Sequence, residues 1–142
     1  MRAFLDTSVL VPVFYGDHMH HAASLDLFTK FPQKDVCCGA HSLLEVYATL
    51  TRMPGKYRVS SEHGMLFIAN IRERMTIVSL NAGEYGDMLK KFTSIGIVGG
   101  AIYDAFLAAC ALKAKAETLF TWNIRHYGQF GPEVARILQS PL

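Results

Sequence analysis

The residue best placed to do chemistry near the start of the sequence is Asp6. It follows a short apolar segment, Ala3-Phe4-Leu5, and two hydroxyl residues, Thr7 and Ser8, come directly after it. A buried strand of an α/β protein opens at its carboxyl end into the crevice where ligands bind. We therefore interpret Asp6 as the first of several carboxylates gathered at one edge of a sheet.

Asp104 and Asn123 are the next two candidates. Asp104 is the only charged residue between Ala101 and Leu112, and a carboxylate in so apolar a segment is costly unless a partner satisfies it. An acid in the first turn also stabilises the helix dipole, so this structural role stays open. Asn123 comes three residues after another apolar segment, where it could equally cap a turn or a helix.

Glu45 is the fourth candidate, on a helix predicted over residues 42–53. Helical periodicity places it opposite an apolar stripe made of Leu43, Val46, Tyr47 and Leu50. That position by itself indicates an ordinary solvated face. If the fold brings Glu45 together with Asp6, Asp104 and Asn123, the four form an all-oxygen site. Such a site suits Mg²⁺ or Mn²⁺ rather than zinc, and it suits metal-assisted hydrolysis of phosphodiesters.

The elements that must position these side chains can be predicted along the chain. Short apolar segments predict strands over 3–5, 36–38, 76–79 and 118–120, with a last edge strand over 134–138. Periodic segments predict a helix from Val9 and further helices over 18–31, 42–53, 60–74, 82–92 and 101–114. The expected N-caps are Ser8, Asp17, Ser60 or Ser61, and Asn81. This alternation indicates a three-layer α/β/α sandwich with a mainly parallel central sheet, in a single domain over residues 1–142.

Composition narrows the class of protein. The chain has 142 residues, of which 51% are hydrophobic and 18% charged, enough for one domain with a sizeable core. The net charge of +2 neither predicts nor excludes a nucleic-acid partner. Three cysteines without a C-x-x-C pair favour a reduced, cytoplasmic protein. No apolar run approaches the roughly 18 residues of a membrane span, and the acid at position 6 argues against a signal peptide.

Four segments together resemble a known family: FLDTSVL at 4–10, SLLEVYATLTRMP at 42–54, GGAIYDAFLAACA at 99–111 and FTWNIRHY at 120–127. Their order, spacing and context are similar to those of PIN-domain nucleases, in particular the VapC-type toxins of prokaryotic toxin–antitoxin pairs. The resemblance spans nearly the whole chain. It implies a ribonuclease that hydrolyses RNA phosphodiesters with Mg²⁺ or Mn²⁺. It also implies a homodimer, and an antitoxin that blocks the acidic groove.

The resemblance assigns roles to single residues. Asp6 matches the first aspartate of the family, Glu45 the helix glutamate and Asp104 the third acid. Asn123 falls where many members carry Asp and others Asn, and an amide supplies no charge, so one or two bound metal ions both stay open. Thr7 and Ser8 match the polar pair after the first aspartate, where a hydroxyl can hold metal-bound water or a carboxylate.

Basic and aromatic residues near these motifs add further candidates. Arg52, Arg125 and His126 are placed to contact RNA, and His126 is a candidate general acid. A basic helix end explains Arg52 equally well. Trp122 could stack on a base, although a lone tryptophan after a strand is more often partly core. The histidines at 18, 20 and 21 are interpreted as surface residues rather than metal ligands.

Two other functions stay open. A PIN-like module that binds RNA or protein with weak or no catalysis is compatible with the amide at Asn123 and the modest net charge. A phosphatase of the haloacid-dehalogenase kind also begins with a strand and an aspartate. That class needs a second aspartate two residues later, where this chain has Ser8.

Overall fold

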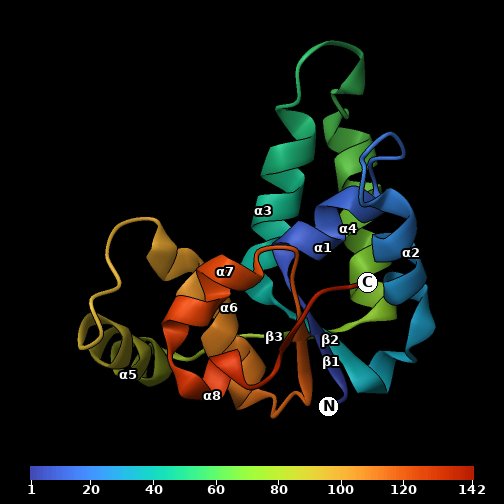
Figure 1. The fold of residues 1–142 in the computed structure, drawn as a ribbon. Helices are drawn as coiled ribbons and strands as arrows, with labels where there is room; N and C mark the ends of the chain where they lie inside the picture. The colour runs from blue at the N-terminus through green and yellow to red at the C-terminus, as the bar shows by residue number, and fades with distance from the viewer.

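The computed structural model describes all 142 residues. The strands are β1 (Ala3–Leu5), β2 (Val36–Gly39), β3 (Thr76–Val78), β4 (Thr118–Phe120) and β5 (Leu138–Gln139). The α-helices are α1 (Thr7–Val13), α2 (His21–Lys30), α3 (Ala40–Thr51), α4 (Ser61–Arg74), α5 (Ala82–Thr93), α6 (Ala101–Lys113), α7 (Ile124–Tyr127) and α8 (Pro132–Ala135), as Figure 1 shows. None of these helices is both long and apolar enough to cross a membrane.

The five strands form one sheet in the order β3-β2-β1-β4-β5, and every neighbouring pair is parallel. The chain builds β1, β2 and β3 toward one edge and then returns to place β4 and β5 on the other side of β1. The direction of winding therefore reverses between β1 and β4. In open α/β sheets, ligands bind at the carboxyl ends of the strands that flank such a switch point.

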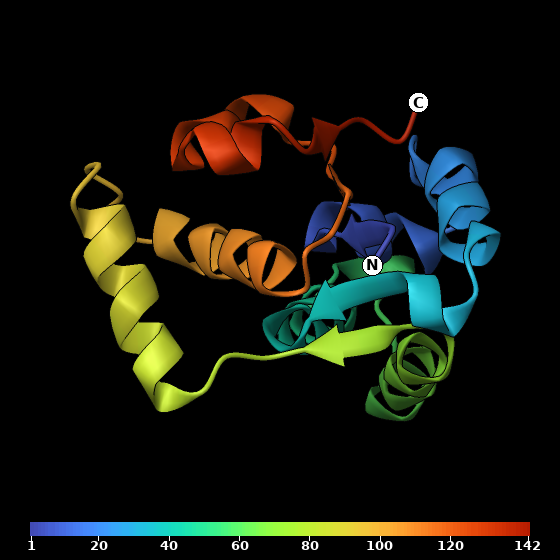
Figure 2. The same ribbon diagram turned by 90° about the horizontal axis from the view of Figure 1, so that it is seen from below.

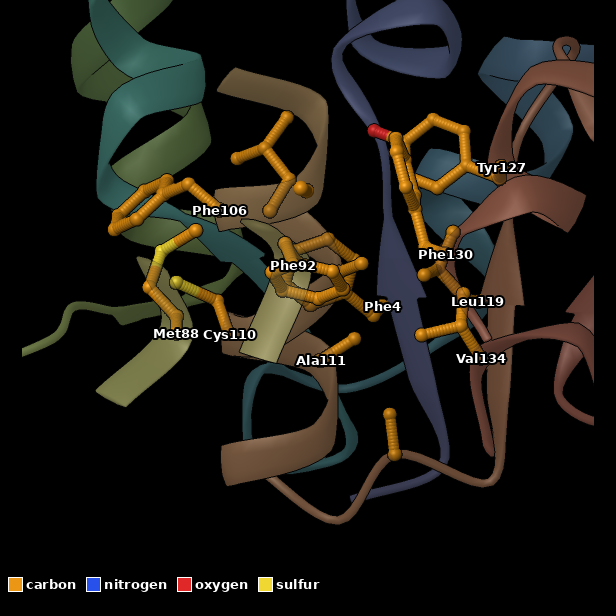
Figure 3. Packing of buried hydrophobic residues seen from close by; sticks show 14 of the residues in the cluster. Phe4, Met88, Phe92, Phe106, Cys110, Ala111, Leu119, Tyr127, Phe130 and Val134 are labelled. Carbon is orange, nitrogen blue, oxygen red and sulfur yellow. The ribbon is translucent and has the colours of Figure 1, made fainter. Parts of the chain in front are cut away.

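The sheet separates two hydrophobic cores. Successive strand residues point to opposite faces: Phe4 lies in one core, whereas Ala3 and Leu5 lie in the other. The Phe4 core is completed by α5, α6 and the segment from Tyr127 to Val134, as Figure 3 shows. The second core is completed by α1, α2, α3 and α4. Figure 2 shows helices on both sides of the strands, which confirms the predicted α/β/α layering.

A close approach between β2 and α6 fixes the helix that carries Asp104. A Cβ atom at Gly39 would lie only 2.6 Å from Cδ2 of Leu107, whose side chain would have to move. A glycine at this position therefore lets α6 lie close against the sheet.

Several predicted element boundaries are wrong. Helix α1 begins at Thr7 with Asp6 in the N-cap position, so Ser8 is not a cap but lies inside the helix. Helix α2 begins at His21, and Asp17 does not cap it, because a turn closed by the His18 carbonyl and the His21 N–H precedes it. The tail forms the short helix α8 before the edge strand, which is limited to β5.

Other caps follow the prediction. The Ser60 side chain accepts a hydrogen bond from the N–H three residues on, and Asn81 forms a complete capping box with Glu84. In α4, Ile68 and Ile71 are buried. Met65 and Ala69, on the same helix, are exposed, so only a narrow stripe of α4 is covered.

Candidate active site

Asp6 lies at the carboxyl end of β1, beside the carboxyl end of β4. Its N–H donates to the carbonyl of Phe120 (3.1 Å), so the pairing of the two strands continues up to the acid. The side chain is 2% exposed. It accepts three hydrogen bonds, from the hydroxyls of Tyr127 (2.6 Å, to Oδ1), Ser8 (2.7 Å, to Oδ2) and Thr121 (2.8 Å, to Oδ2). These donors replace water and fix the orientation of the carboxylate.

Tyr127 belongs to the core that contains Phe4, and it brings its hydroxyl to this acid from there. The side chain is fully buried, and its ring packs edge-on against Phe130 at a centroid distance of 5.3 Å. Figure 3 shows its hydroxyl at the carboxyl end of β1. Burial, and then the negative charge of Asp6, raise the pKa of the Tyr127 phenol well above its ordinary value. The phenol therefore stays protonated and acts as a permanent donor.

Glu45 is joined to the start of α1 through Thr7. The Thr7 hydroxyl donates to Oε1 of Glu45 (2.9 Å) and lies 2.8 Å from Oγ of the buried Ser42. Because a hydroxyl has a single hydrogen, Ser42 is the donor in the second bond. Glu45 is half-buried, so the solvated face indicated by helical periodicity is wrong. Helix α1 packs against α3 here and covers this part of the helix.

Asp104 lies in the first turn of α6 and pairs with His126 of α7. The distance between Oδ2 of Asp104 and Nε2 of His126 is 2.8 Å. Nδ1 of His126 lies 2.8 Å from the side-chain Nε2 of Gln129. Since an amide nitrogen donates, Nδ1 accepts and Nε2 carries the hydrogen that points to Asp104. The Asp104 and His126 side chains are 28% and 36% exposed, so the pair borders on solvent.

Burial and neighbouring charges shift the pKa values of two of these acids, Asp104 and Glu45. Burial raises the pKa of Asp104, and the charge of Asp6 raises it further, while His126 opposes both. Burial also raises the pKa of Glu45. The hydrogen bond from Thr7 lowers this pKa, and the charges of Asp104 and Asp6 raise it further. Like charges held together in this way favour the uptake of a proton or a cation.

The donor set fits a hard divalent cation. The three acids and the Asn123 amide offer oxygen atoms, the ligands that Mg²⁺ and Mn²⁺ prefer. No three His, Cys, Asp or Glu side chains are placed so that together they could already hold an ion. Mg²⁺ needs no such group, because it keeps several waters and binds proteins through one or two carboxylates. The mutual repulsion of the acids favours cation binding, so the residues fit the expected metal.

Asn123 lies two residues after Thr121, one of the hydroxyl donors to Asp6. It occupies the N-cap position of α7, but its side chain neither caps the helix nor makes any other hydrogen bond. Only its backbone N–H is engaged, with Oγ1 of Thr121 (3.0 Å). The side chain lines an open cavity of about 670 Å³ together with Arg125 and His126. The structure thus leaves the amide free toward solvent next to His126.

The predicted basic residues fall in two places. Arg125 and His126 line the same cavity as Asn123, whereas Arg52 lies exposed at the end of α3. Seven residues separate Arg52 from Glu45, which corresponds to about 10 Å along a helix. His126 is therefore the basic candidate that contacts an acid, and Arg125 lies beside it on the wall of the same cavity.

Three hydroxyl residues of the site, Tyr127, Thr121 and Ser42, are not among the residues predicted from the sequence. Two features of the sequence could have pointed to them. Thr121 directly follows β4, as Asp6 directly follows the adjacent β1, and Tyr127 ends the short FTWNIRHY segment. Hydroxyl groups that directly follow parallel strands are natural donors to a carboxylate at the same sheet edge. The turn of α7, which returns Tyr127 to the core, could not be read from the sequence.

Comparison with known proteins shows the family. The chain matches the PIN domain family over residues 3–127. Ribonuclease VapC40 of Mycobacterium tuberculosis is 31% identical over 120 residues, which cover 84% of this chain and 85% of that protein. Ribonuclease VapC27 of the same organism is 29% identical over 113 residues, covering 80% and 79% of the two chains.

A solved structure shows the same fold. The crystal structure of VapBC2 from Rickettsia felis bound to a DNA fragment from their promoter aligns with a TM-score of 0.67 at 20% identity, covering 99% of this chain and 98% of that one. The parallel sheet, its two helix layers and the acids at the switch point define an α/β/α protein with a carboxylate site. The chain belongs to the PIN domain family and, within it, is of the VapC type.

Proposed function

We propose that this protein is a divalent-metal-dependent endoribonuclease that hydrolyses RNA phosphodiesters as the toxin of a toxin–antitoxin pair. The observation that carries the proposal is the set of contacts around the carboxyl end of β1: Thr7, next to Asp6, donates to Glu45. Tyr127 donates to Asp6, and its neighbour His126 pairs with Asp104. Membership of the PIN domain family and the two relatives named as ribonucleases, each aligned over about four fifths of the chain, support it.

Asp6, Glu45 and Asp104 are the residues that would hold Mg²⁺ or Mn²⁺, with the Asn123 amide as a fourth oxygen donor. When bound, such an ion lowers the pKa of an attacking water and neutralises charge on the phosphate. The three hydroxyls around Asp6 hold its carboxylate in one orientation. Thr7 does the same for Glu45. The protein thus contributes a rigid set of acids rather than a mobile one.

The groups around the acids would handle the RNA strand. Arg125 supplies a cation on the wall of the open cavity, where it can pair with a phosphate. His126 is held between Asp104 and Gln129 with a hydrogen on Nε2, so it can orient Asp104. To donate a proton to a leaving oxygen, its ring must first take up a second proton on Nδ1. Arg52, at the end of α3, would contact a more distant phosphate.

We also propose that the chain acts in the cytoplasm as one domain, forms a homodimer and binds an antitoxin. The likeness of the fold to a chain of the VapBC2 complex supports an antitoxin partner. Helices α3 and α4 expose large apolar side chains, among them Leu44 (67% exposed), Met65 (57%) and Leu66 (63%). An apolar surface of this kind is typical of protein–protein contacts.

Cleavage of a mixed cellular RNA pool tests the proposed reaction. Wild-type protein is compared with Asp104→Asn and with a control, Asp87→Asn, which changes an exposed acid of α5. We expect cleavage by wild type and control only when Mg²⁺ or Mn²⁺ is added, and none by Asp104→Asn. Undiminished cleavage by Asp104→Asn, or in the presence of a chelator, would contradict the proposal.

A binding module without catalysis is the second candidate function. The free amide of Asn123 and the absence of a preformed group of three metal-binding side chains favour it. Calorimetry with Mn²⁺ and a gel-shift assay with RNA separate the two. RNA binding without cleavage, together with no divalent binding, would support the module.

A further inference from the structure

A second cavity, of about 270 Å³, lies beside the acids, between the residues that precede α2 and those that follow β4. Ser8, His18, His20, Trp122 and Asn123 contribute to its wall, and no lysine or arginine does. We propose that this cavity is a nucleobase subsite, in which one base of the RNA strand extends the stack formed by His20 and Trp122. That the base belongs to an RNA strand depends on the proposed function, whereas the recognition of a base does not.

The aromatic platform already exists in the protein. The rings of His20 and Trp122 are stacked with centroids 3.6 Å apart and an interplanar angle of 8°. The indole Nε1–H donates to Oγ of Ser24 (3.0 Å), which is fully buried. The backbone N–H of Trp122 donates to Oγ of Ser8 (3.0 Å). A tryptophan held at both ends, with its side chain only half-buried, is preorganised to receive a flat ligand.

Ser8 connects this platform to the acidic site. Its hydroxyl oxygen accepts from Trp122 while its hydrogen is donated to Oδ2 of Asp6 (2.7 Å). A single side chain therefore sets the spacing between the first acid and the stacked rings. A base on the platform would lie near the phosphate at the acids, so the two contacts would come from neighbouring parts of one strand.

The polar groups of this cavity suit a neutral base edge rather than a phosphate. Nδ1 of His18 accepts a hydrogen bond from the N–H of His20 (3.0 Å), so a neutral His18 ring carries its hydrogen on Nε2. Burial, followed by the neighbouring histidines, lowers the pKa of His18 and favours that neutral form. The Asn123 side chain has no partner and offers both a donor and an acceptor. Base edges are read by such groups.

Trp122 is the only tryptophan of the chain, so its fluorescence reports on the cavity directly. Wild-type protein is titrated in a chelator, which prevents metal-dependent cleavage, with adenosine, guanosine, cytidine and uridine, and in parallel with ribose. We expect saturable quenching by at least one nucleoside and none by ribose. Equal responses to ribose and to all four nucleosides would overturn the subsite.

Substitutions then test the stack with fluorescently labelled hexaribonucleotides, using anisotropy in the same chelator. Trp122→Leu should weaken binding by roughly 5- to 150-fold, the range for loss of one stacked base, and Trp122→Phe should retain most of the affinity. His20→Ala covers the case in which Trp122→Leu does not fold, and it should also weaken binding. His63→Ala, which removes an exposed histidine of α4, is the matched control. Unchanged affinity of His20→Ala and folded Trp122→Leu would overturn the proposal.

Failure of this inference can be told apart from failure of the proposed reaction. If nucleosides quench the fluorescence of Trp122 but the protein never cleaves RNA, the base subsite stands and the nuclease proposal fails. If wild type cleaves RNA and the KM and kcat of His20→Ala and of folded Trp122→Leu equal those of wild type, the nuclease stands and the subsite is overturned.

Discussion

Replacing Tyr127 with phenylalanine removes one oxygen atom from the centre of the site. That oxygen donates a 2.6 Å hydrogen bond to Asp6, and both side chains are almost completely buried. A hydrogen bond to a charged group contributes about 1.5–3 kcal/mol, and no water can enter to replace it. At about 4 °C per kcal/mol for a domain of this size, Tm should fall by about 6–12 °C.

Thermal unfolding followed by circular dichroism in a chelator measures this effect without any contribution from bound metal. The matched control is Tyr103→Phe, because the hydroxyl of this 55% exposed side chain makes no hydrogen bond. Its free energy of unfolding should stay within about 0.5 kcal/mol of wild type. Repeating Tyr127→Phe in an Asp6→Asn background should cost only about 1 kcal/mol, since the acceptor is then neutral.

Two results would refute this reasoning. If Tyr127→Phe unfolds at the wild-type temperature, the hydroxyl does not hold a charged acid in place. If the substitution costs the same with and without the Asp6 carboxylate, the effect comes from packing of the ring edge and not from the hydrogen bond.

Three further predictions concern the neighbouring acids. Because the pKa values of Asp104 and Glu45 are raised in the folded state, their contribution to stability is complete below their ordinary values of 3.8 and 4.5 and is lost as pH rises through the raised values. Asp104→Asn should therefore become progressively more stable relative to wild type as pH rises through this window, as measured by urea unfolding; a constant difference would contradict it. Mn²⁺ at about 100 times its Kd should stabilise wild type by about 2.7 kcal/mol and Asp104→Asn by clearly less, measured as a shift in Tm; equal shifts would place the ion elsewhere. Thr7→Val removes the donor to Glu45 and the acceptor of Ser42, so it should lower the free energy of unfolding by about 1–3 kcal/mol. The control Thr29→Val, on the exposed face of α2, should lower it by less than about 0.5 kcal/mol. Equal losses would show that the Thr7 bonds contribute nothing.

Much of the fold could be predicted from local patterns. The strands before Asp6 and Thr121 are short, apolar and buried on both faces, and such segments between helices indicate a parallel sheet. Caps with a strong chemical preference, Ser60 and Asn81, were also predicted correctly. The start of α1 was not, because Ser8 uses its hydroxyl for Asp6 instead of for the helix. Tertiary hydrogen bonds took precedence over the local capping preference.

In the candidate site, too, some residues could be predicted from local patterns and others depend on tertiary contacts. Asp6 and Asp104 are recognisable because each is an acid in an apolar context, but periodicity alone placed Glu45 in solvent. Its half-buried position depends on α1 packing against α3, which is a tertiary contact that no local pattern reports. Tyr127 was missed for the same reason, since its hydroxyl reaches Asp6 from 121 residues away in the sequence.

The chemistry of the RNA ends tests the central claim most directly, namely that the acids at the switch point serve attack by water. RNA is digested in water enriched in heavy oxygen with Mn²⁺ present, and the new ends are analysed by mass spectrometry. We predict a terminal phosphate that carries one heavy oxygen, no 2′,3′-cyclic phosphate, and no products from Asp104→Asn. Cyclic phosphate ends without the label would contradict the account, because they arise when the ribose 2′-hydroxyl attacks instead of water.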